Sequence, residues 1–136
     1  MYAKPMPLPT RTSQPFWDAL RDHRLVMQRC KDCDRWIWYP RPHCHHCGSR
    51  DWQWLPLSGE ATLYSVCVSP RPTAPMFADE TPQALALVEL AEGPRLTTTL
   101  VGAADAAWRV GMPLAPVFDD RGPVTLLRFG PVAGQT

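Results

Sequence analysis

Hydrophobic and polar residues alternate along most of the chain, a pattern that predicts short strands. The exception lies near the start, where Phe16, Trp17 and Leu20 recur at helical spacing. Ser13 precedes this stretch as a candidate cap, and Pro15 suits the first turn of a helix. The pattern therefore predicts one short helix near the N-terminus.

Alternating residues at 25–28 predict a brief strand that leads into a pair of cysteines. Four tryptophans then alternate in two pairs, Trp36 with Trp38 and Trp52 with Trp54. A small sheet has little other apolar mass to bury, so packing is the favoured role for these rings. A platform on which a ligand stacks is the alternative.

The sequence pattern changes at Gly59. After it, five segments show the alternation of hydrophobic and polar residues that is typical of strands. Gly93 and Pro94 form a turn between the second and third, and an Ala-rich stretch at 103–108 is long enough for one or two helical turns. Three strands, a helical connection and two further strands is the order of a five-stranded OB-type barrel. The predicted strands are 61–68, 84–90, 95–101, 114–119 and 124–129.

The connection between the first two of these strands, 69–83, is unusually long and holds four prolines and the apolar pair Met76 and Phe77. Loops of this length in compact domains are often functional, and on this fold they flank the binding face. We therefore treat 69–83 as a candidate binding loop.

Four cysteines carry the strongest chemical signal. Cys30 with Cys33 and Cys44 with Cys47 form two C-x-x-C pairs, separated by ten residues. Two such turns facing each other place four thiolates around one metal ion, and a closed set of four ligands indicates a structural zinc site. A rubredoxin-like iron site and a dithiol redox pair are the alternatives.

The histidines and the fifth cysteine are not expected to bind the metal. His43, His45 and His46 crowd the second cysteine pair, but thiolates outrank them as soft donors once four are present. Cys67 lies in an apolar alternating stretch, which predicts a buried, inert thiol. The zinc ligands are therefore expected to be the four paired cysteines alone.

Composition narrows the class of protein. The chain has 136 residues, 16 prolines and a formal net charge of +1, which suits a small metal-held module plus a compact barrel. No charge excess marks a surface for phosphate backbones. No apolar run is long enough to span a membrane, and the N-terminal MYAKPMPLPT lacks a signal-peptide core. Paired cysteines in such a chain are typical of metal binding, so a cytoplasmic location is expected.

Together these patterns predict a mainly β protein: a short N-terminal helix and a rubredoxin-like zinc ribbon, followed by a five-stranded OB-fold barrel. The expected division is a flexible arm at 1–12, helix plus ribbon at 13–57, the OB-fold at 58–130 and a tail at 131–136.

Five segments carry a resemblance to a known family: FWDALRDHRLVMQRCKDC, YPRPHCHHCGS, SGEATLYSVCV, ALALVELAEGPRLTTTLVG and VGMPLAPVFDD. In this order they resemble the zinc-ribbon plus OB-fold accessory proteins of domain-of-unknown-function family thirty-five. One departure is Asp34, where the family usually has glycine. That position often needs a left-handed backbone, which Asp tolerates better than most residues.

The resemblance implies a non-catalytic accessory subunit of an acyl-CoA-processing complex. Such proteins accompany thiolase-superfamily subunits or are joined to hot-dog-fold enoyl-CoA hydratases, in hetero-oligomers. The ribbon and helix are then expected to dock the partner and the OB-fold to assist acyl-CoA binding. No membrane or nucleic acid is implied as a partner.

The residues themselves offer no catalytic group by motif. Asp79 and Glu80 are adjacent acids in a polar loop, where solvation is the usual state. Arg71, on the candidate loop, is the residue we expect to meet the phosphates or adenine of CoA, ahead of Arg95, Arg109 and Arg121. A single-stranded nucleic-acid binder is the main alternative function. A stand-alone enzyme that uses Cys67 or a clustered histidine is another.

Overall fold

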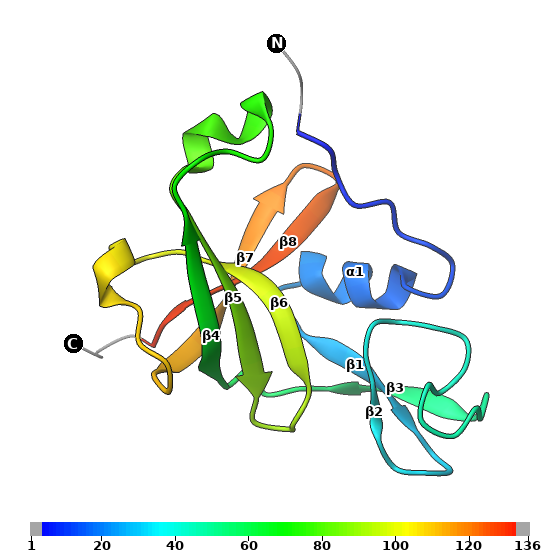
Figure 1. Cartoon of the computed structure of the whole chain (residues 1–136). Helices are drawn as coiled ribbons and strands as arrows, with labels where there is room; N and C mark the ends of the chain where they lie inside the picture. Colours follow the sequence, from blue (N-terminus) through cyan, green and yellow to red (C-terminus); the bar gives the residue numbers. More distant parts are fainter. Residues whose placement is uncertain (1–3, 133–136) are drawn as a thin grey trace.

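The computed structural model describes residues 4–132 as one helix and two sheets (Figure 1). Helix α1 (Gln14–Arg21) has Pro15 in its first turn and buries Phe16, Ala19 and Leu20. The predicted helix is confirmed. Its cap differs from the prediction, because the Ser13 hydroxyl accepts a 2.8 Å hydrogen bond from the Thr10 N–H outside the helix and makes no bond to the helix itself.

The first sheet is the ribbon, with strand order β2-β1-β3. Its strands are β1 (Val26–Cys30), β2 (Trp36–Ile37) and β3 (Trp52–Pro56). All side chains of 25–28 are buried, so the expected alternation of buried and exposed positions is wrong here. Leu25 and Met27 join the main core, while Gln28 is bonded to the backbone of Arg41. The central strand is therefore covered on both faces.

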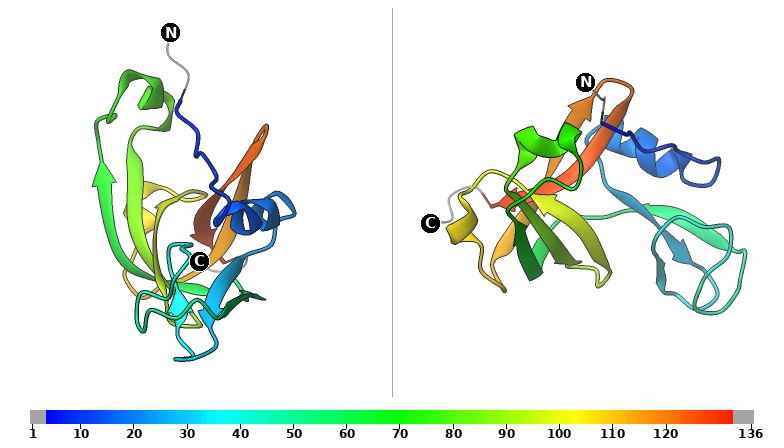
Figure 2. Two further views of the ribbon diagram at one scale, coloured as in Figure 1. Left: turned by 90° about the vertical axis from the view of Figure 1, so that its right-hand side faces the viewer. Right: turned by 45° about the horizontal axis from the view of Figure 1, so that its top comes forward.

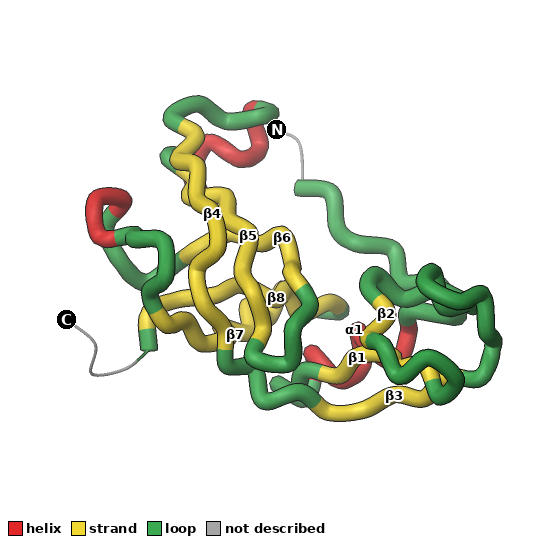
Figure 3. Tube along the Cα trace, turned by 60° about the horizontal axis from the view of Figure 1, so that its bottom comes forward, coloured by secondary structure: helices red, strands yellow, loops and turns green. Residues whose placement is uncertain are grey.

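The second sheet closes into a barrel with strand order β4-β5-β6-β8-β7, the OB-fold predicted from the sequence (Figure 3). The link between β6 and β7 contains only a single 3-10 turn, η2 (Asp105–Ala107), and the long loop contains another, η1 (Pro75–Glu80). The five strands are β4 (Ala61–Ser69), β5 (Gln83–Leu90), β6 (Arg95–Leu100), β7 (Pro113–Arg121) and β8 (Val124–Pro131).

A bulge in β4 overturns the prediction that Cys67 is buried. The register with β5 shifts between Leu63 and Ser65, so Val66 lies opposite the buried Ala86 and Cys67 lies opposite the exposed Leu85. One extra residue in a strand moves every later side chain to the other face. Cys67 is therefore exposed on the outside of the barrel.

Helix, ribbon and barrel share one hydrophobic core. The ribbon lies to one side of the barrel with α1 beside β8 (Figure 2). Phe16 and Leu20 of α1 pack with barrel residues such as Leu96 and Phe129. Three of the four ribbon tryptophans pack against this core, and Trp52 packs against the cysteine cluster, so the predicted packing role is confirmed.

The structure near the two ends of the chain agrees only in part with the predicted arm and tail. Lys4 pairs with Asp79 at 2.9 Å and with Glu80 at 2.7 Å, which ties the start of the described chain to the long loop. At the other end Pro131 belongs to β8, and 133–136 lie outside the described residues. Flexibility of the arm stays a prediction. Within 4–132 no helix is long and apolar enough to cross a membrane.

Candidate metal centre and binding surfaces

Two matching turns position the four cysteines. The first begins where β1 ends at Cys30, and the Asp34 N–H donates to the Cys30 carbonyl at 3.1 Å. The second repeats the pattern, with the Gly48 N–H donating to the Cys44 carbonyl at 2.8 Å. Asp34 has φ +63°, so the left-handed turn expected at this departure from the family pattern is present.

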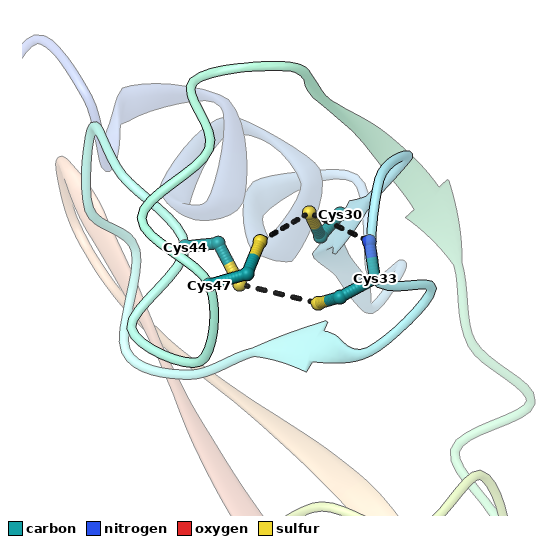
Figure 4. Close-up of side chains that lie close together, drawn as sticks. All are labelled: Cys30, Cys33, Cys44 and Cys47. Carbon is teal, nitrogen blue, oxygen red and sulfur yellow. Dashed lines mark hydrogen bonds between the residues drawn. The ribbon is translucent and has the colours of Figure 1, made fainter.

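The four sulfur atoms converge from these turns and lie within 4.8 Å of one another (Figure 4). Sγ of Cys30 is 3.6 Å from Sγ of Cys47, and Sγ of Cys33 is 3.6 Å from Sγ of Cys44. Tetrahedral zinc–sulfur bonds of about 2.3 Å require sulfur–sulfur separations of about 3.8 Å. The donor set and its spacing therefore fit a zinc ion, which would cross-link the two turns.

The thiols do not ionise alike. A backbone N–H donated by Cys33 lowers the pKa of Cys30 to about 7, whereas burial raises the pKa of Cys33 to about 12. A bound zinc ion would remove this difference, because every coordinating thiol is held as a thiolate.

The three neighbouring histidines make other contacts. Nε2 of His43 accepts a 2.8 Å hydrogen bond from Arg50, and Nε2 of His46 lies 3.3 Å from the Trp36 carbonyl. The ring of His45 lies against that of His46, with centroids 4.0 Å apart. In the described part of the chain, the cluster with metal-ligand spacing contains the four cysteines and no histidine.

The candidate CoA-binding arginines are not gathered into one cluster. Arg71 is exposed near the start of the long loop, and Arg109 is exposed after η2. Arg95 pairs with Glu89 at 2.9 Å and lies over the Tyr64 ring, while Arg121 pairs with Asp119. Among these four, Arg71 and Arg109 are thus the exposed guanidinium groups with no ion pair among residues 4–132.

Sequence reasoning missed a partly buried ion network around Arg128. Its guanidinium donates to Asp119 at 2.8 Å and to Glu80 at 3.0 Å, and it also bonds Thr99. Glu80 in turn bonds Lys4, so the expectation that this acid is merely solvated is wrong. The partners are far apart in sequence, and each has the pattern of an ordinary surface charge, so no local signal predicts the network.

The network holds its carboxyl groups ionised. Hydrogen bonds from Arg121, opposed by partial burial, and then from Arg128 hold the pKa of Asp119 below its usual range. Burial opposes ionisation of Glu80, but the hydrogen bond from Lys4 and the charge of Arg128 outweigh it, so the pKa of Glu80 is also lowered. The positive charge of Arg128 is therefore already neutralised within the fold.

The outer face of β5 and β6 is the surface on which OB-folds commonly bind ligands. Here Leu85 and Leu87 point outward and are each 37% exposed. Their cross-strand neighbours are Thr99 and Thr97. These four residues are uncharged, and the Arg95–Glu89 pair lies at one end of the face.

A four-cysteine ribbon that shares its core with an OB-fold barrel defines a class of two-module proteins. These have a structural zinc site and an exposed outer face on the barrel. Two family models match these modules. The rubredoxin-like zinc ribbon domain of ChsH2 matches residues 17–53, and the C-terminal OB-fold domain of ChsH2 matches residues 54–119. The chain belongs to this ChsH2-type, zinc-ribbon plus OB-fold family, also called DUF35.

Curated relatives support the same family. A DUF35 domain-containing scaffold protein of Methanocaldococcus jannaschii is 30% identical over 75% of this chain and 73% of its own length. A probable enoyl-CoA hydratase alpha subunit of Thermomonospora curvata is 39% identical over 97% of this chain. The 3-oxo-4,17-pregnadiene-20-carboxyl-CoA hydratase alpha subunit of Mycobacterium tuberculosis is 32% identical over 84%. The chain spans only 41% and 36% of these two hydratase subunits.

A solved structure provides a match over nearly the whole fold. A chain of the Ltp2-ChsH2(DUF35) aldolase superposes with a TM-score of 0.81 and 39% sequence identity. The match covers 93% of this chain and 98% of that chain. The similarity therefore extends over helix, ribbon and barrel together.

Proposed function

We propose that this chain is a non-catalytic accessory subunit of an acyl-CoA-processing complex. The partner would be a thiolase-superfamily subunit, or alternatively a hot-dog-fold hydratase, and the assembly a hetero-oligomer. The observation that carries the proposal is the match over 98% of a chain of the Ltp2-ChsH2(DUF35) aldolase. The two hydratase alpha subunits among the relatives support acyl-CoA as the substrate class.

The contacts of the described histidines support a role without catalysis. The rings of His23, His43 and His46 bond a carboxylate, a guanidinium group and a backbone carbonyl, respectively. Between 4 and 132, none of these contacts joins a histidine ring to a hydroxyl or thiol, as nucleophilic catalysis by such a pair requires. Cys67 is exposed, but no base is bonded to it in that part of the chain.

We further propose that the ribbon and α1 dock the partner while the OB-fold assists acyl-CoA binding, with Arg71 meeting the CoA phosphates. Arg71 is exposed on the loop that flanks the β5–β6 face and is free of acidic partners among the described residues. A planar guanidinium group suits bidentate phosphate contacts. Zinc would act as a structural cross-link that keeps the ribbon folded for docking.

Single-stranded nucleic acid is the weaker candidate. OB-fold proteins of that class track the backbone with a basic groove and stack bases on exposed aromatic rings. Here the β5–β6 face carries leucines and threonines, and the ribbon tryptophans are partly buried and packed against the two cores.

The test is reconstitution of the zinc-loaded chain with the host's own thiolase-like and hydratase subunits, each purified separately. Size-exclusion chromatography and native mass spectrometry should give one complex of fixed ratio, and turnover of an acyl-CoA by the partner should require this chain. Arg71→Ala should weaken binding of free CoA while Arg109→Ala, an equally exposed arginine, should not. A chain that binds neither subunit but shifts single-stranded RNA at near-physiological salt would overturn the proposal.

A further inference from the structure

A cavity of about 380 Å³ lies where helix, ribbon and barrel meet. Its first wall is α1, through Phe16, Trp17 and Leu20, and its second is the segment after β2, through Trp38 and Tyr39. The floor is formed by residues of β6 and β8. Most of this lining is aliphatic or aromatic, so the cavity suits an apolar occupant.

The cavity exists because the barrel is scarcely paired along one seam. Strands β6 and β8 are paired in parallel only at Leu100 and Phe129. Further along, a side chain bridges them, since the Thr98 hydroxyl donates to the Leu127 carbonyl at 3.1 Å. The two strands therefore leave a gap at the surface, and α1 and the ribbon form walls above it.

The walls are held in place by hydrogen bonds and do not depend on an occupant. The buried Gln28 amide bonds the backbone of Arg41 twice, and the Arg41 guanidinium donates to the carbonyls of Trp38 and Tyr39. Nε1 of Trp17 donates to the Tyr39 hydroxyl at 3.2 Å, linking the first wall to the second. The site is thus largely preformed, which lowers the entropy cost of binding.

The chemistry of the lining defines the ligand. The one charged group, Arg128, is neutralised by Asp119 and Glu80. The polar groups near solvent are the hydroxyls of Tyr39, which is 42% exposed, and Thr97. The cavity therefore does not favour an anion. A neutral carbonyl at its entrance can accept a hydrogen bond from one of these two hydroxyls. The cavity is open to solvent on one side, and its volume is more than twice that of an enclosed 150 Å³ cavity that binds benzene, which sets an upper bound of roughly fifteen carbon atoms on the occupant.

We propose that this cavity binds the apolar acyl group of a CoA thioester, of roughly ten to fifteen carbons, with the thioester near Tyr39 and Thr97 and CoA outside. The inference rests on the proposed acyl-CoA function and adds a site and a chain-length preference to it. Phe16 packs edge to face against both Trp17 and Trp38, with a centroid distance of 5.2 Å in each pair. These contacts fix the orientation of the three rings that would contact the acyl group.

The test is calorimetric titration of the zinc-loaded chain with dodecanoyl-CoA, acetyl-CoA and free CoA, each below its critical micelle concentration. Dodecanoyl-CoA should bind at least tenfold more tightly than acetyl-CoA, because only its chain is long enough to fill the cavity. Thr97→Phe fills the mouth and should remove this preference. Thr62→Phe, at an exposed threonine of β4 that does not line the cavity, should retain it.

A second readout locates the chain. 12-Bromododecanoyl-CoA should quench tryptophan fluorescence, and Trp17→Phe should reduce the quenching because Trp17 lines the cavity. Equal affinities for dodecanoyl-CoA and acetyl-CoA, or a preference that Thr97→Phe leaves intact in a protein of normal zinc content, would overturn the inference. Assembly with the partner subunit is measured separately, so this outcome would leave the proposed accessory function to be decided by the reconstitution test.

Discussion

The side-chain amide of Gln28 makes two 2.9 Å hydrogen bonds with the backbone of Arg41, one to its N–H and one to its carbonyl. Gln28 has 0% exposure and lies at the centre of the ribbon, on β1. By bonding both the N–H and the carbonyl of one residue, the buried amide takes the place of a backbone pairing partner in a sheet. It thereby fixes the segment that carries Trp38 and Tyr39 above the barrel seam.

Replacing Gln28 by leucine should destabilise the protein by about 1–3 kcal/mol, since it removes both hydrogen bonds and leaves the Arg41 backbone groups short of partners. Urea denaturation of the zinc-loaded protein measures the change. Gln53→Leu, at an exposed glutamine of β3, is the matched control and should change stability by less than about 0.5 kcal/mol. Equal losses in both variants would refute a special role for Gln28.

Substitution of Cys44 by serine should release zinc and unfold the ribbon, because metal binding and ribbon folding are one equilibrium. Zinc content by mass spectrometry and the circular dichroism spectrum report the two effects. Cys67→Ser should retain stoichiometric zinc, since Cys67 lies on the outside of β4 away from the cluster.

The barrel should respond to the loss of the ribbon as well. Trp36, Trp38 and Trp54 pack against the core shared with the barrel, so their release lowers barrel stability without removing its strand pairing. Retention of one zinc per chain in the Cys44→Ser protein would mean that a neighbouring histidine can serve as the fourth ligand.

The ion network predicts a pH dependence. The pKa of Asp119 is lowered in the folded protein, so its stabilisation is present above its unfolded pKa of about 4 and is lost as the pH falls through its lower folded value. Asp119→Asn should therefore cost about 1–2 kcal/mol at pH 7, and this difference from the unsubstituted protein should shrink below about pH 4.

Urea denaturation at pH 7 and at pH 3 tests this sign. Zinc leaves both proteins in acid, so the difference between them isolates the carboxyl group. Asp105→Asn, at an exposed acid without an ion pair among residues 4–132, should match the unsubstituted protein at both values. A deficit in Asp119→Asn that is as large at pH 3 as at pH 7 would show that charge is not its cause.

Gly59 joins the ribbon to the barrel at a close approach of two segments. Its φ is +84°, and an added Cβ would lie 2.9 Å from Cγ of Pro116. Gly59→Ala should destabilise by about 2–3 kcal/mol, combining backbone strain with overpacking. Gly122→Ala carries the strain alone, with φ +70° and open space around the new Cβ, and should cost about 1 kcal/mol. Thermal unfolding would separate the two, and equal costs would exclude the contact with Pro116.

The zinc ribbon and the order of strands were determined by local sequence. Two residues separate the cysteines within each pair, so each turn brings its own two ligands together, and Asp34 adopts the left-handed conformation that its position requires. The barrel strands follow from alternation and from turns such as Gly93-Pro94. These features depend on neighbours in the chain, which the sequence displays directly.

Tertiary structure alone decided where the isolated polar and apolar residues lie. The bulge in β4 reversed the side on which Cys67 lies, and the burial of Gln28 depended on a turn thirteen residues away. Arg128 on β8 pairs with Glu80 of the long loop, 48 residues away in the sequence. The cavity likewise needs a helix, a ribbon turn and a strand seam to meet. Such features arise from register and from long-range packing, in which the energy of a side chain is set by partners that its local sequence does not specify.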